Sequence, residues 1–527
     1  MAASEASMQW GTEIRRSDGP IPFLCYEPRR RRVTELLDDA ARWSDRVHLV
    51  QGERRVRYSD MFVAIDRVAA ALHEEGLRAG DRLLLLAGNS PDWVIAWWAG
   101  LRLGAVVAPG NRWWSASEIT HAIKLTTPTV VVADAKMATL LPHGDKTWRA
   151  ISIEQVHDWG SRPSAAVLPG VVTDENDPAV IIFTAGTTGA AKAAVLAHRS
   201  VIANLHNLLL VSGRLPHQLA SDRTGEVILQ SGPLFHIGGV QSLLLALLGG
   251  NTVVFLDNRF DAGQVLDVIE REQITVWGAV PTMVVRVLEH PTVQGRDLTR
   301  VRSISLGGAP VTAELMARLR AAFPAVHRGV STVYGMTEAG GTVAAASGAM
   351  MAAHPHTSGK PLPVVELRIE SSGEIVVRTP SQMLGYWGES APEIIDAEGW
   401  LHTGDLGRIE DGLLYLTGRA KDIIIRGGEN IAAAHVEEVL HRHPAVAAVA
   451  VVGLPHPDLG EIVGAAVQVR SETSEAELAA FAAASLGRFE VPTRWWLSED
   501  PLPMTDAGKV NKRALRKQWI STLEIPS

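Results

Sequence analysis

Residues that could bind phosphate stand together in the segment 183–192, which reads Phe-Thr-Ala-Gly-Thr-Thr-Gly-Ala-Ala-Lys. The segment follows the apolar run 179–182, and a loop that leaves a strand can turn several backbone N–H groups and hydroxyls toward one anion. Glycine permits close approach of the backbone, and Lys192 adds a compact positive charge. A Walker A loop needs Gly-Lys-Ser/Thr in succession, so the pattern predicts a phosphate site of a different type. Taken alone, the segment is equally compatible with a surface turn.

Six further segments carry groups suited to chemistry, and each is a weak indication by itself. They are 233–239, 306–310, 334–338, 399–405, 419–430 and 503–509. Backbone exposed after a buried strand suits the edge of a flat heterocycle, and an acid after a turn, such as Asp405, suits a ribose diol. Glu338 could ligate Mg²⁺, which prefers oxygen donors and bridges phosphates. His236 lies in an apolar turn, where a histidine is more often structural, and Lys509 lies on a glycine-containing loop.

The hydrophobic pattern of the chain predicts the strands and helices that must position these residues. From about 33 to 410, short apolar runs alternate with helix-like stretches, which predicts parallel sheets covered by helices. Predicted strands are 82–86, 130–132, 181–183, 252–255 and 303–306, and predicted helices are 60–76, 91–103, 262–272 and 312–322. From 364 to 417, alternating strands with Gly-rich turns predict antiparallel β-structure.

A change of texture near Gly418 predicts a second domain. The residues that follow contain predicted helices at 436–443 and 474–486, predicted strands at 447–453 and 463–469, and a polar tail. The fold class is therefore α/β, with a large N-terminal domain of β-sheets flanked by helices plus a β-rich subdomain. The predicted limits are 1–417 for the large domain, 418–422 for a hinge and 423–527 for a small C-terminal α+β domain.

Composition bounds the class of protein. A chain of 527 residues with 46% hydrophobic and 20% charged residues is typical of a globular enzyme with two or more domains. The net charge of −8 gives no reason to expect nucleic acid as a partner. A single cysteine, Cys25, excludes an intramolecular disulfide and a cysteine zinc cluster, and it fits a reducing compartment. With no signal-peptide pattern and no long uninterrupted apolar stretch, we expect a cytoplasmic protein without an integral membrane segment.

In order and spacing, the seven segments together resemble the acyl-adenylate-forming superfamily, which contains acyl-CoA synthetases, luciferases and the adenylation domains of nonribosomal peptide synthetases. The resemblance extends over about 35 to 515, and the segment 233–239 is most similar to fatty-acid or aryl CoA ligases. It implies a small mobile C-terminal domain and ATP-dependent activation of a carboxylic acid, fatty or otherwise hydrophobic, to acyl-AMP. Transfer to CoA would then give acyl-CoA, AMP and pyrophosphate, with Mg²⁺ as the metal.

The resemblance also implies roles for the residues that match the family's motifs. ATP and AMP would be bound by Thr184, Gly186, Thr187, Thr188, Gly189, Gly308, Ala309, Pro310, Tyr334, Gly335, Asp405 and Arg419. The catalytic residues would be Lys192, Thr337, Glu338 and Lys509, with Glu338 also the Mg²⁺ ligand. The acyl group would lie against His236, Gly238, Gly239, Trp277, Ala339 and Gly340. CoA would meet Gly427 and Gly428, and Lys421 would be the hinge residue.

The chain departs from the family's pattern in three places. In the phosphate loop, Ala185, Ala191 and Ala193 replace a serine, a proline and a glycine, so the loop loses a hydroxyl donor, a rigid position and a permissive one. The segment 432–435 lacks the family's Pro-x-Glu, and Met504 stands where a basic residue is common. These departures bear on rate and on the handling of pyrophosphate, while the charged site residues are retained.

The chemistry requires cations, because adenylation brings a carboxylate to a polyanion. Lys509 would neutralise charge between carboxylate and α-phosphate, and Lys192 would stabilise the phosphates. Three alternatives remain open: an acyl-AMP ligase that loads a carrier-protein phosphopantetheine, a non-catalytic member that binds acyl-AMP or nucleotide, and, less favoured, amino-acid adenylation. The last usually needs an aspartate where this chain has Phe235-His236. The sequence leaves the acid and the oligomeric state open, a dimer included.

Overall fold

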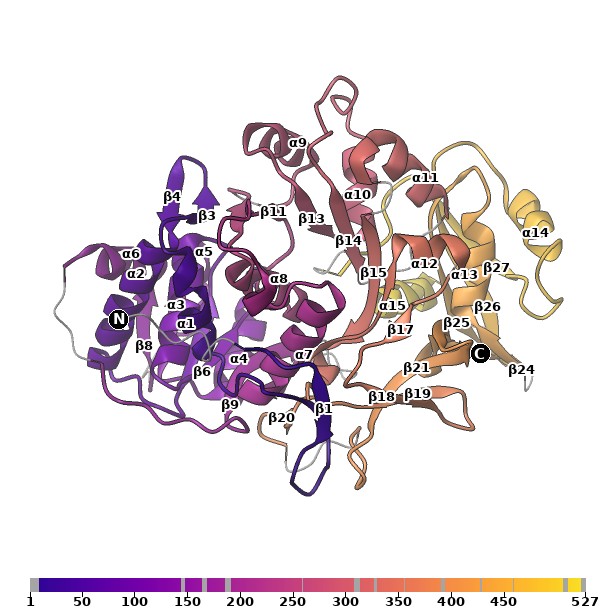
Figure 1. Ribbon diagram of the computed structural model, residues 1–527. Coiled ribbons are helices and arrows are strands. Elements are labelled where there is room, and N and C mark those ends of the chain that lie inside the picture. Colours follow the sequence, from indigo (N-terminus) through magenta and orange to yellow (C-terminus); the bar gives the residue numbers. More distant parts are fainter. Residues whose placement is uncertain are drawn as a thin grey trace. The chain divides into compact units, whose positions relative to one another are not determined.

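The computed structural model describes residues 9–143, 147–163, 168–184, 191–257, 259–307, 313–326, 329–354, 356–389, 394–426, 429–457, 459–505 and 510–522. The chain divides into two compact units (Figure 1). Unit 1 consists of Met1–Leu367 with Val377–Leu401, and unit 2 consists of Arg368–Val376 with His402–Ser527.

The first large sheet of unit 1 has seven strands. Their order is β20 (Gly385–Tyr386), β10 (Lys192–Ala197), β9 (Pro178–Thr184), β6 (Val106–Pro109), β5 (Arg82–Leu86), β7 (Val130–Ala133) and β8 (Arg149–Ser152). Strands from β9 to β8 are parallel, whereas β10 is antiparallel to both β9 and β20. Leu83 and Leu85 join one core cluster and Leu84 and Leu86 another, because successive side chains of a strand point to opposite faces. Both faces are therefore covered, as a continuous apolar run predicts.

The second large sheet of unit 1 has nine strands. Their order is β17 (Lys360–Pro361), β16 (Gly341–Ser347), β15 (Val330–Met336), β14 (Ser303–Gly307), β13 (Val276–Ala279), β11 (Val227–Gln230), β12 (Thr252–Phe255), β3 (Val47–Gln51) and β4 (Arg54–Arg57). The strands from β15 to β3 are parallel, and both edges are antiparallel. An N-terminal hairpin pairs β1 (Glu13–Arg16) with β2 (Leu24–Glu27).

Helices connect the strands of unit 1. The α-helices are α1 (Glu35–Ala40), α2 (Tyr58–Glu74), α3 (Pro91–Arg102), α4 (Ala116–Thr126), α5 (Ala135–Ala138), α6 (Ile153–Ser161), α7 (His198–Val211), α8 (Ile237–Leu248), α9 (Ala262–Arg271), α10 (Pro281–Leu288), α11 (Ala313–Ala322) and α12 (Gly348–Ala353). The 3₁₀ turns are η2 (Ala41–Trp43), η3 (Pro216–Gln218), η4 (Pro324–Val326) and η5 (Thr337–Ala339). Ser90 caps α3 by accepting a hydrogen bond from the Trp93 N–H, and Pro91 occupies the first turn, so this helix begins where its sequence predicts.

Unit 2 is built on two smaller sheets. One has the order β18 (Glu366–Ile369), β19 (Glu374–Arg378), β21 (Leu401–Glu410) and β22 (Leu413–Arg419). The other has the order β24 (Glu429–Ala432), β23 (Ile423–Arg426), β26 (Gly460–Val469) and β25 (Val446–His456), with β27 (Arg494–Ser498) also paired to β26. Its helices are η6 (Ala420–Asp422), α13 (Ala433–His441), α14 (Glu475–Ala483) and α15 (Lys512–Thr522).

The predicted fold class is confirmed, and so are the predicted strands and helices, with ends shifted by a few residues. The predicted polar tail contains a strand and a helix that the sequence did not predict, β27 and α15. The helix α15 escapes notice because it buries only a narrow stripe, Leu515 and Trp519, four residues apart. The domain limits at 417 and 423 stay a prediction.

Candidate active site

The two ends of the predicted phosphate loop lie opposite each other. Strands β9 and β10 are antiparallel, and their register pairs Thr184 with Lys192. The residues between them at 185–190 lie outside the described residues, and with them the predictions for Gly186, Thr187, Thr188 and Gly189. At the second end of the loop, Nε2 of His121, on α4, donates a hydrogen bond to the carbonyl oxygen of Ala191 at 2.9 Å. The two described ends of the loop are therefore held by a strand pair and, just before Lys192, by a histidine that the sequence analysis did not predict.

Lys192 contacts an aromatic ring and a carboxylate. Its Nζ atom lies 4.4 Å from the ring centroid of Tyr386 and 3.1 Å from Oε1 of Glu389. The ring contact follows from the sheet, because Tyr386 pairs with Ala194 and therefore lies diagonal to Lys192 across the two strands. The side chains of Lys192 and Glu389 are 36% and 41% exposed, so the ammonium remains accessible to a ligand.

The same tyrosine contacts Glu338, which follows β15 in the turn η5. The Tyr386 hydroxyl donates a hydrogen bond to Oε1 of Glu338 at 3.0 Å, and the Met383 N–H donates to the Glu338 carbonyl oxygen at 2.8 Å. Burial and the negative charge of Glu338 both raise the pKa of Tyr386, so the phenol stays protonated and acts as the donor. Two predicted catalytic residues, Lys192 and Glu338, thus contact the same side chain, Tyr386, which was not among the predicted site residues.

The residues present fit a magnesium ion held largely by phosphate. Among the residues that the structure describes, no three His, Cys, Asp or Glu side chains gather into a metal cluster. Mg²⁺ commonly uses one or two carboxylates and completes its octahedron with water and substrate phosphates. Glu338, which accepts a hydrogen bond from the Tyr386 hydroxyl, is a carboxylate of the kind that such an ion uses, and its role as the ligand stays a prediction.

Two glycines near Glu338, Gly335 and Gly340, lie too close to neighbouring backbone for any side chain to fit. A Cβ atom on Gly335 would lie 2.0 Å from the Gly341 carbonyl oxygen. A Cβ atom on Gly340, which has φ of +73°, would lie 1.9 Å from the Ser381 carbonyl oxygen. Close packing against Ser381 is therefore enough to explain a glycine at position 340, which was predicted to line the acyl site. Nearby, Ala339 is fully buried, Tyr334 is 8% exposed, and Thr337 begins η5.

The predicted acyl-binding turn surrounds the start of α8. His236 is the N-terminal cap residue. The ring centroid of Phe235 lies 4.5 Å from that of His236 and 5.5 Å from that of Trp113. A Cβ atom on Gly238 would meet nothing within 4 Å, whereas one on Gly239 would lie 2.3 Å from the Pro233 carbonyl oxygen. Gly238 therefore borders open space, while Gly239 is required for packing.

Trp277 lies on β13, in a hydrophobic core cluster of unit 1. It is fully buried, packs near Phe323 and donates its indole N–H to Ser231 Oγ at 2.9 Å. Its neighbour Gly278, which was not predicted, is exposed, and a Cβ atom there would meet nothing within 4 Å. The open surface at this strand end is therefore at Gly278, and the contact of Trp277 with an acyl group stays a prediction.

The predicted ribose pair lies in unit 2. Asp405 on β21 and Arg419 at the end of β22 face each other across the hairpin, with Nε of Arg419 2.8 Å from Oδ1 of Asp405. Asp405 is also held by its own N–H, which donates to Thr403 Oγ1. Lys421 lies in η6, directly after this hairpin. The predictions for Gly308, Ala309, Pro310, Gly427, Gly428 and Lys509 lie outside the described residues.

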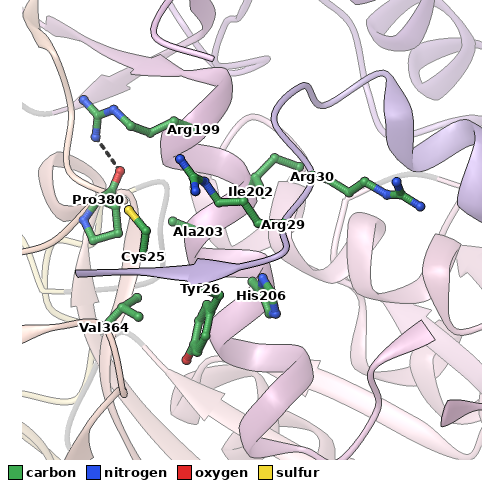
Figure 2. A pocket seen from close by; sticks show the side chains of 10 residues that line it. All are labelled: Cys25, Tyr26, Arg29, Arg30, Arg199, Ile202, Ala203, His206, Val364 and Pro380. Atoms are coloured by element: carbon green, nitrogen blue, oxygen red, sulfur yellow. Dashed lines mark hydrogen bonds between the residues drawn. The ribbon is translucent and has the colours of Figure 1, made fainter. Parts of the chain in front are cut away.

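A small pocket of about 10 Å³, the size of a single water site and partly open to solvent, lies elsewhere in unit 1 (Figure 2). It is lined by Cys25, Tyr26, Arg29, Arg30, Arg199, Ile202, Ala203, His206, Val364 and Pro380, none of which is a predicted site residue. Burial raises the pKa of the Cys25 thiol and lowers that of His206 to about 4. Both groups are neutral near pH 7, which argues against a nucleophilic centre there.

No helix in the described part of the chain is long and apolar enough to cross a membrane. The model of the AMP-binding enzyme family matches residues 36–387, and that of the AMP-binding enzyme C-terminal domain matches 435–509.

Feruloyl-CoA synthase of an Amycolatopsis species is 33% identical over 89% of this chain and 95% of its own length. 4-Coumarate–CoA ligase 1 of rice is 32% identical over 88% and 87%. The structure of o-succinylbenzoate CoA synthetase from Bacillus subtilis, in complex with ATP and a magnesium ion, superposes with a TM-score of 0.78 at 28% identity, over 92% of this chain and 98% of that one. The matches span both the sheet-rich body and the C-terminal part, and the chain belongs to the AMP-binding enzyme family.

Proposed function

We propose that the protein is an AMP-forming acid–CoA ligase that activates a hydrophobic carboxylic acid. The observation that carries this proposal is the placement of Lys192 against the ring face of Tyr386 and of Glu338 at its hydroxyl, beside the strand pair that flanks the predicted phosphate loop. A cation and a carboxylate that can hold Mg²⁺ are what a nucleoside triphosphate needs. The enzyme uses ATP, Mg²⁺ and CoA, as expected for a family whose relatives above are CoA ligases.

Catalysis proceeds in two half-reactions. A carboxylate oxygen attacks the α-phosphorus of ATP, pyrophosphate leaves, and the product is acyl-AMP. The CoA thiol then attacks the acyl carbon, and AMP leaves. Lys192 offsets charge on the phosphates, and Glu338 would hold Mg²⁺, which would supply further neutralisation of phosphate charge when bound. Lys509 is proposed to lie between the carboxylate and the α-phosphate, and Thr337 to contact the α-phosphate.

The proposed roles in binding the ribose, forming the hinge and binding CoA rest on the positions of these residues in the chain. Asp405 and Arg419 hold the ribose, since an acid fixed by an arginine and a backbone contact presents a preorganised acceptor for hydroxyls. The residues 418–422 form the hinge, with Lys421 at its centre, and Gly427-Gly428 meet CoA. A reducing location such as the cytoplasm fits the single cysteine, whose thiol is buried.

The acid is proposed to carry an aromatic ring or another bulky apolar group. Gly238 and Gly278 each border open space, and Gly238 follows Phe235, whose ring contacts that of Trp113; these observations support this class. Feruloyl-CoA synthase and 4-coumarate–CoA ligase, which act on aromatic acids, are among the relatives. CoA is the proposed acceptor, with a carrier-protein phosphopantetheine as the alternative.

The test is an ATP–pyrophosphate exchange screen over aromatic, polycyclic, medium-chain and long-chain acids, followed by mass spectrometry with and without CoA. Exchange with an aromatic or polycyclic acid and formation of its acyl-CoA is the expected outcome. Acyl-AMP that accumulates in the presence of CoA would point to the carrier-protein acceptor instead. An absence of exchange with every acid would contradict ligase activity.

A further inference from the structure

We propose that Tyr386 is a positioning residue for adenylation, which holds the Lys192 ammonium against its ring face and the Glu338 carboxylate with its hydroxyl. The inference rests on the proposed function, because it assigns a role within the same nucleotide site. Tyr386 is 9% exposed and belongs to a hydrophobic core cluster, so plain packing is the competing explanation.

The backbone of Tyr386 is locked to the strand that carries Lys192. The Leu384 N–H donates to the Val195 carbonyl oxygen and the Trp387 N–H donates to the Ala193 carbonyl oxygen, both at 2.8 Å. These bonds flank the tyrosine on β20 and set its register against β10. The ring therefore keeps a constant position relative to the end of the phosphate loop.

The ring of Tyr386 contacts the Lys192 ammonium while the lysine side chain stays partly exposed to solvent. An ammonium within about 6 Å of an aromatic centroid is attracted by the ring's negative face, and the distance here is 4.4 Å. Glu389 contacts the same ammonium at 3.1 Å. The ring contact confines a side chain that otherwise has four rotatable bonds, which lowers the entropy lost when the ammonium meets phosphate, whereas Glu389 competes with phosphate for the same ammonium.

The hydroxyl fixes the metal-ligating carboxylate. Oε1 of Glu338 accepts the phenol hydrogen bond at 3.0 Å, and the Glu338 backbone is tied at 2.8 Å to Met383, three residues before Tyr386. A carboxylate has about four lone-pair sites, and the phenol hydroxyl uses only one of them. The hydrogen bond therefore orients Glu338 and leaves the other lone pairs available to a cation. Phenylalanine would supply only the ring and glutamine only the donor, whereas tyrosine supplies both.

Tyr386→Phe tests the hydroxyl, because it keeps the ring and the packing volume. We measure the Mg²⁺ concentration that gives half of the thermal stabilisation by ATP, in the absence of any acid substrate. The variant should need about tenfold more Mg²⁺, the scale of one hydrogen bond to a charged group, and its unliganded melting temperature should fall by only a few degrees. Tyr386→Leu should in addition weaken ATP stabilisation at saturating Mg²⁺, since it also removes the ring under Lys192.

Tyr26→Phe is the matched control. It removes a buried phenol hydrogen bond of 2.6 Å, to Oδ1 of Asn207, at a place where no nucleotide group is assigned. This variant should lower the melting temperature and leave the Mg²⁺ requirement unchanged. A double-mutant cycle of Tyr386→Phe with Glu338→Gln should be strongly non-additive in the Mg²⁺ requirement, because the hydroxyl acts through that carboxylate.

An unchanged Mg²⁺ requirement in Tyr386→Phe would overturn the inference, and so would a change in melting temperature with no shift in the Mg²⁺ requirement. Additive effects in the cycle would overturn it as well. If ATP with Mg²⁺ fails to stabilise the wild type, the proposed function itself is contradicted. That result is distinct from a wild type that responds and a Tyr386→Phe variant that responds identically.

Discussion

Two charged groupings in this molecule are built on opposite principles. In unit 2, Asp405 and Arg419 are direct partners across one hairpin, separated by a short stretch of chain. In unit 1, Lys192, Glu338 and Tyr386 come from three distant parts of the sequence and meet because β20 pairs with β10 and η5 follows β15. The first grouping depends on local register, and the second depends on the topology of the whole unit.

The two groupings should also differ in energy. The Arg419 side chain is 47% exposed, and an ion pair with one exposed partner contributes about 1 kcal/mol or less to stability. The Tyr386 hydroxyl lies in a nearly buried side chain, where a lost partner costs the desolvation of a polar group, about 1–3 kcal/mol. Mutations in unit 2 should therefore act on ligand binding, whereas those in unit 1 should act on preorganisation as well.

The largest effect is expected for Lys192→Ala. Removing the cation that faces the phosphates should lower the rate of ATP–pyrophosphate exchange by about 10²–10³ at saturating acid. Lys124→Ala, at an exposed lysine of α4, is the control and should behave as the wild type. A loss below about threefold would show that Lys192 serves the loop's structure rather than the charge of the transition state.

The next effect is expected for Asp405→Asn in unit 2. The change should raise the KM for ATP about tenfold with a smaller effect on kcat, because it removes a charged acceptor for ribose hydroxyls. The free energy of unfolding should change by about 1 kcal/mol or less. Arg408→Ala on the same hairpin breaks the exposed pair with Glu410 and is the matched control. A collapse of stability in Asp405→Asn, with the KM unchanged, would reverse the comparison.

Much of the site could be predicted from the sequence. What could not be predicted are the contacts that, like those of Tyr386, join distant parts of the chain. Family, fold class, reaction class and the use of ATP, Mg²⁺ and CoA were predicted and are confirmed. Asp405, Arg419, Lys192 and Glu338 each belong to a sequence motif that contains glycine, so their types and spacing are visible in the chain. The site residues themselves remain predictions until variants are measured.

Tyr386, Glu389 and His121 could not be found in that way. Tyr386 lies on a strand of two residues and His121 in the middle of an ordinary amphipathic helix, so neither has a local pattern. Their contacts arise only when β20 joins β10 and when α4 reaches the loop end. Glycines mislead in the opposite direction: Gly239 and Gly340 suggest an open acyl site, but the chain passes too close to both for a side chain.

His121→Phe should have a moderate effect. It keeps a ring in α4 but removes the donor to the Ala191 carbonyl oxygen, directly before Lys192. The adenylation kcat should fall about fivefold, the scale of one hydrogen bond, with the KM for the acid unchanged. His121→Gln, which retains a donor, should recover part of the rate. Equal losses in the two variants would indicate that the helix packing, rather than the hydrogen bond, supports the loop.

The smallest effect, of opposite sign, is expected for Glu389→Gln. Glu389 pairs with the Lys192 ammonium at 3.1 Å and must yield it to the phosphates of ATP. Both side chains are partly exposed, so the pair contributes less than about 1 kcal/mol, and the KM for ATP should fall about two- to threefold. Because salt screens such pairs, the gain should shrink at high ionic strength. Glu53→Gln, an exposed acid between β3 and β4, is the control. A higher KM in Glu389→Gln would instead make Glu389 a partner that holds Lys192 in its working position, and the unit 1 cluster would then have four members.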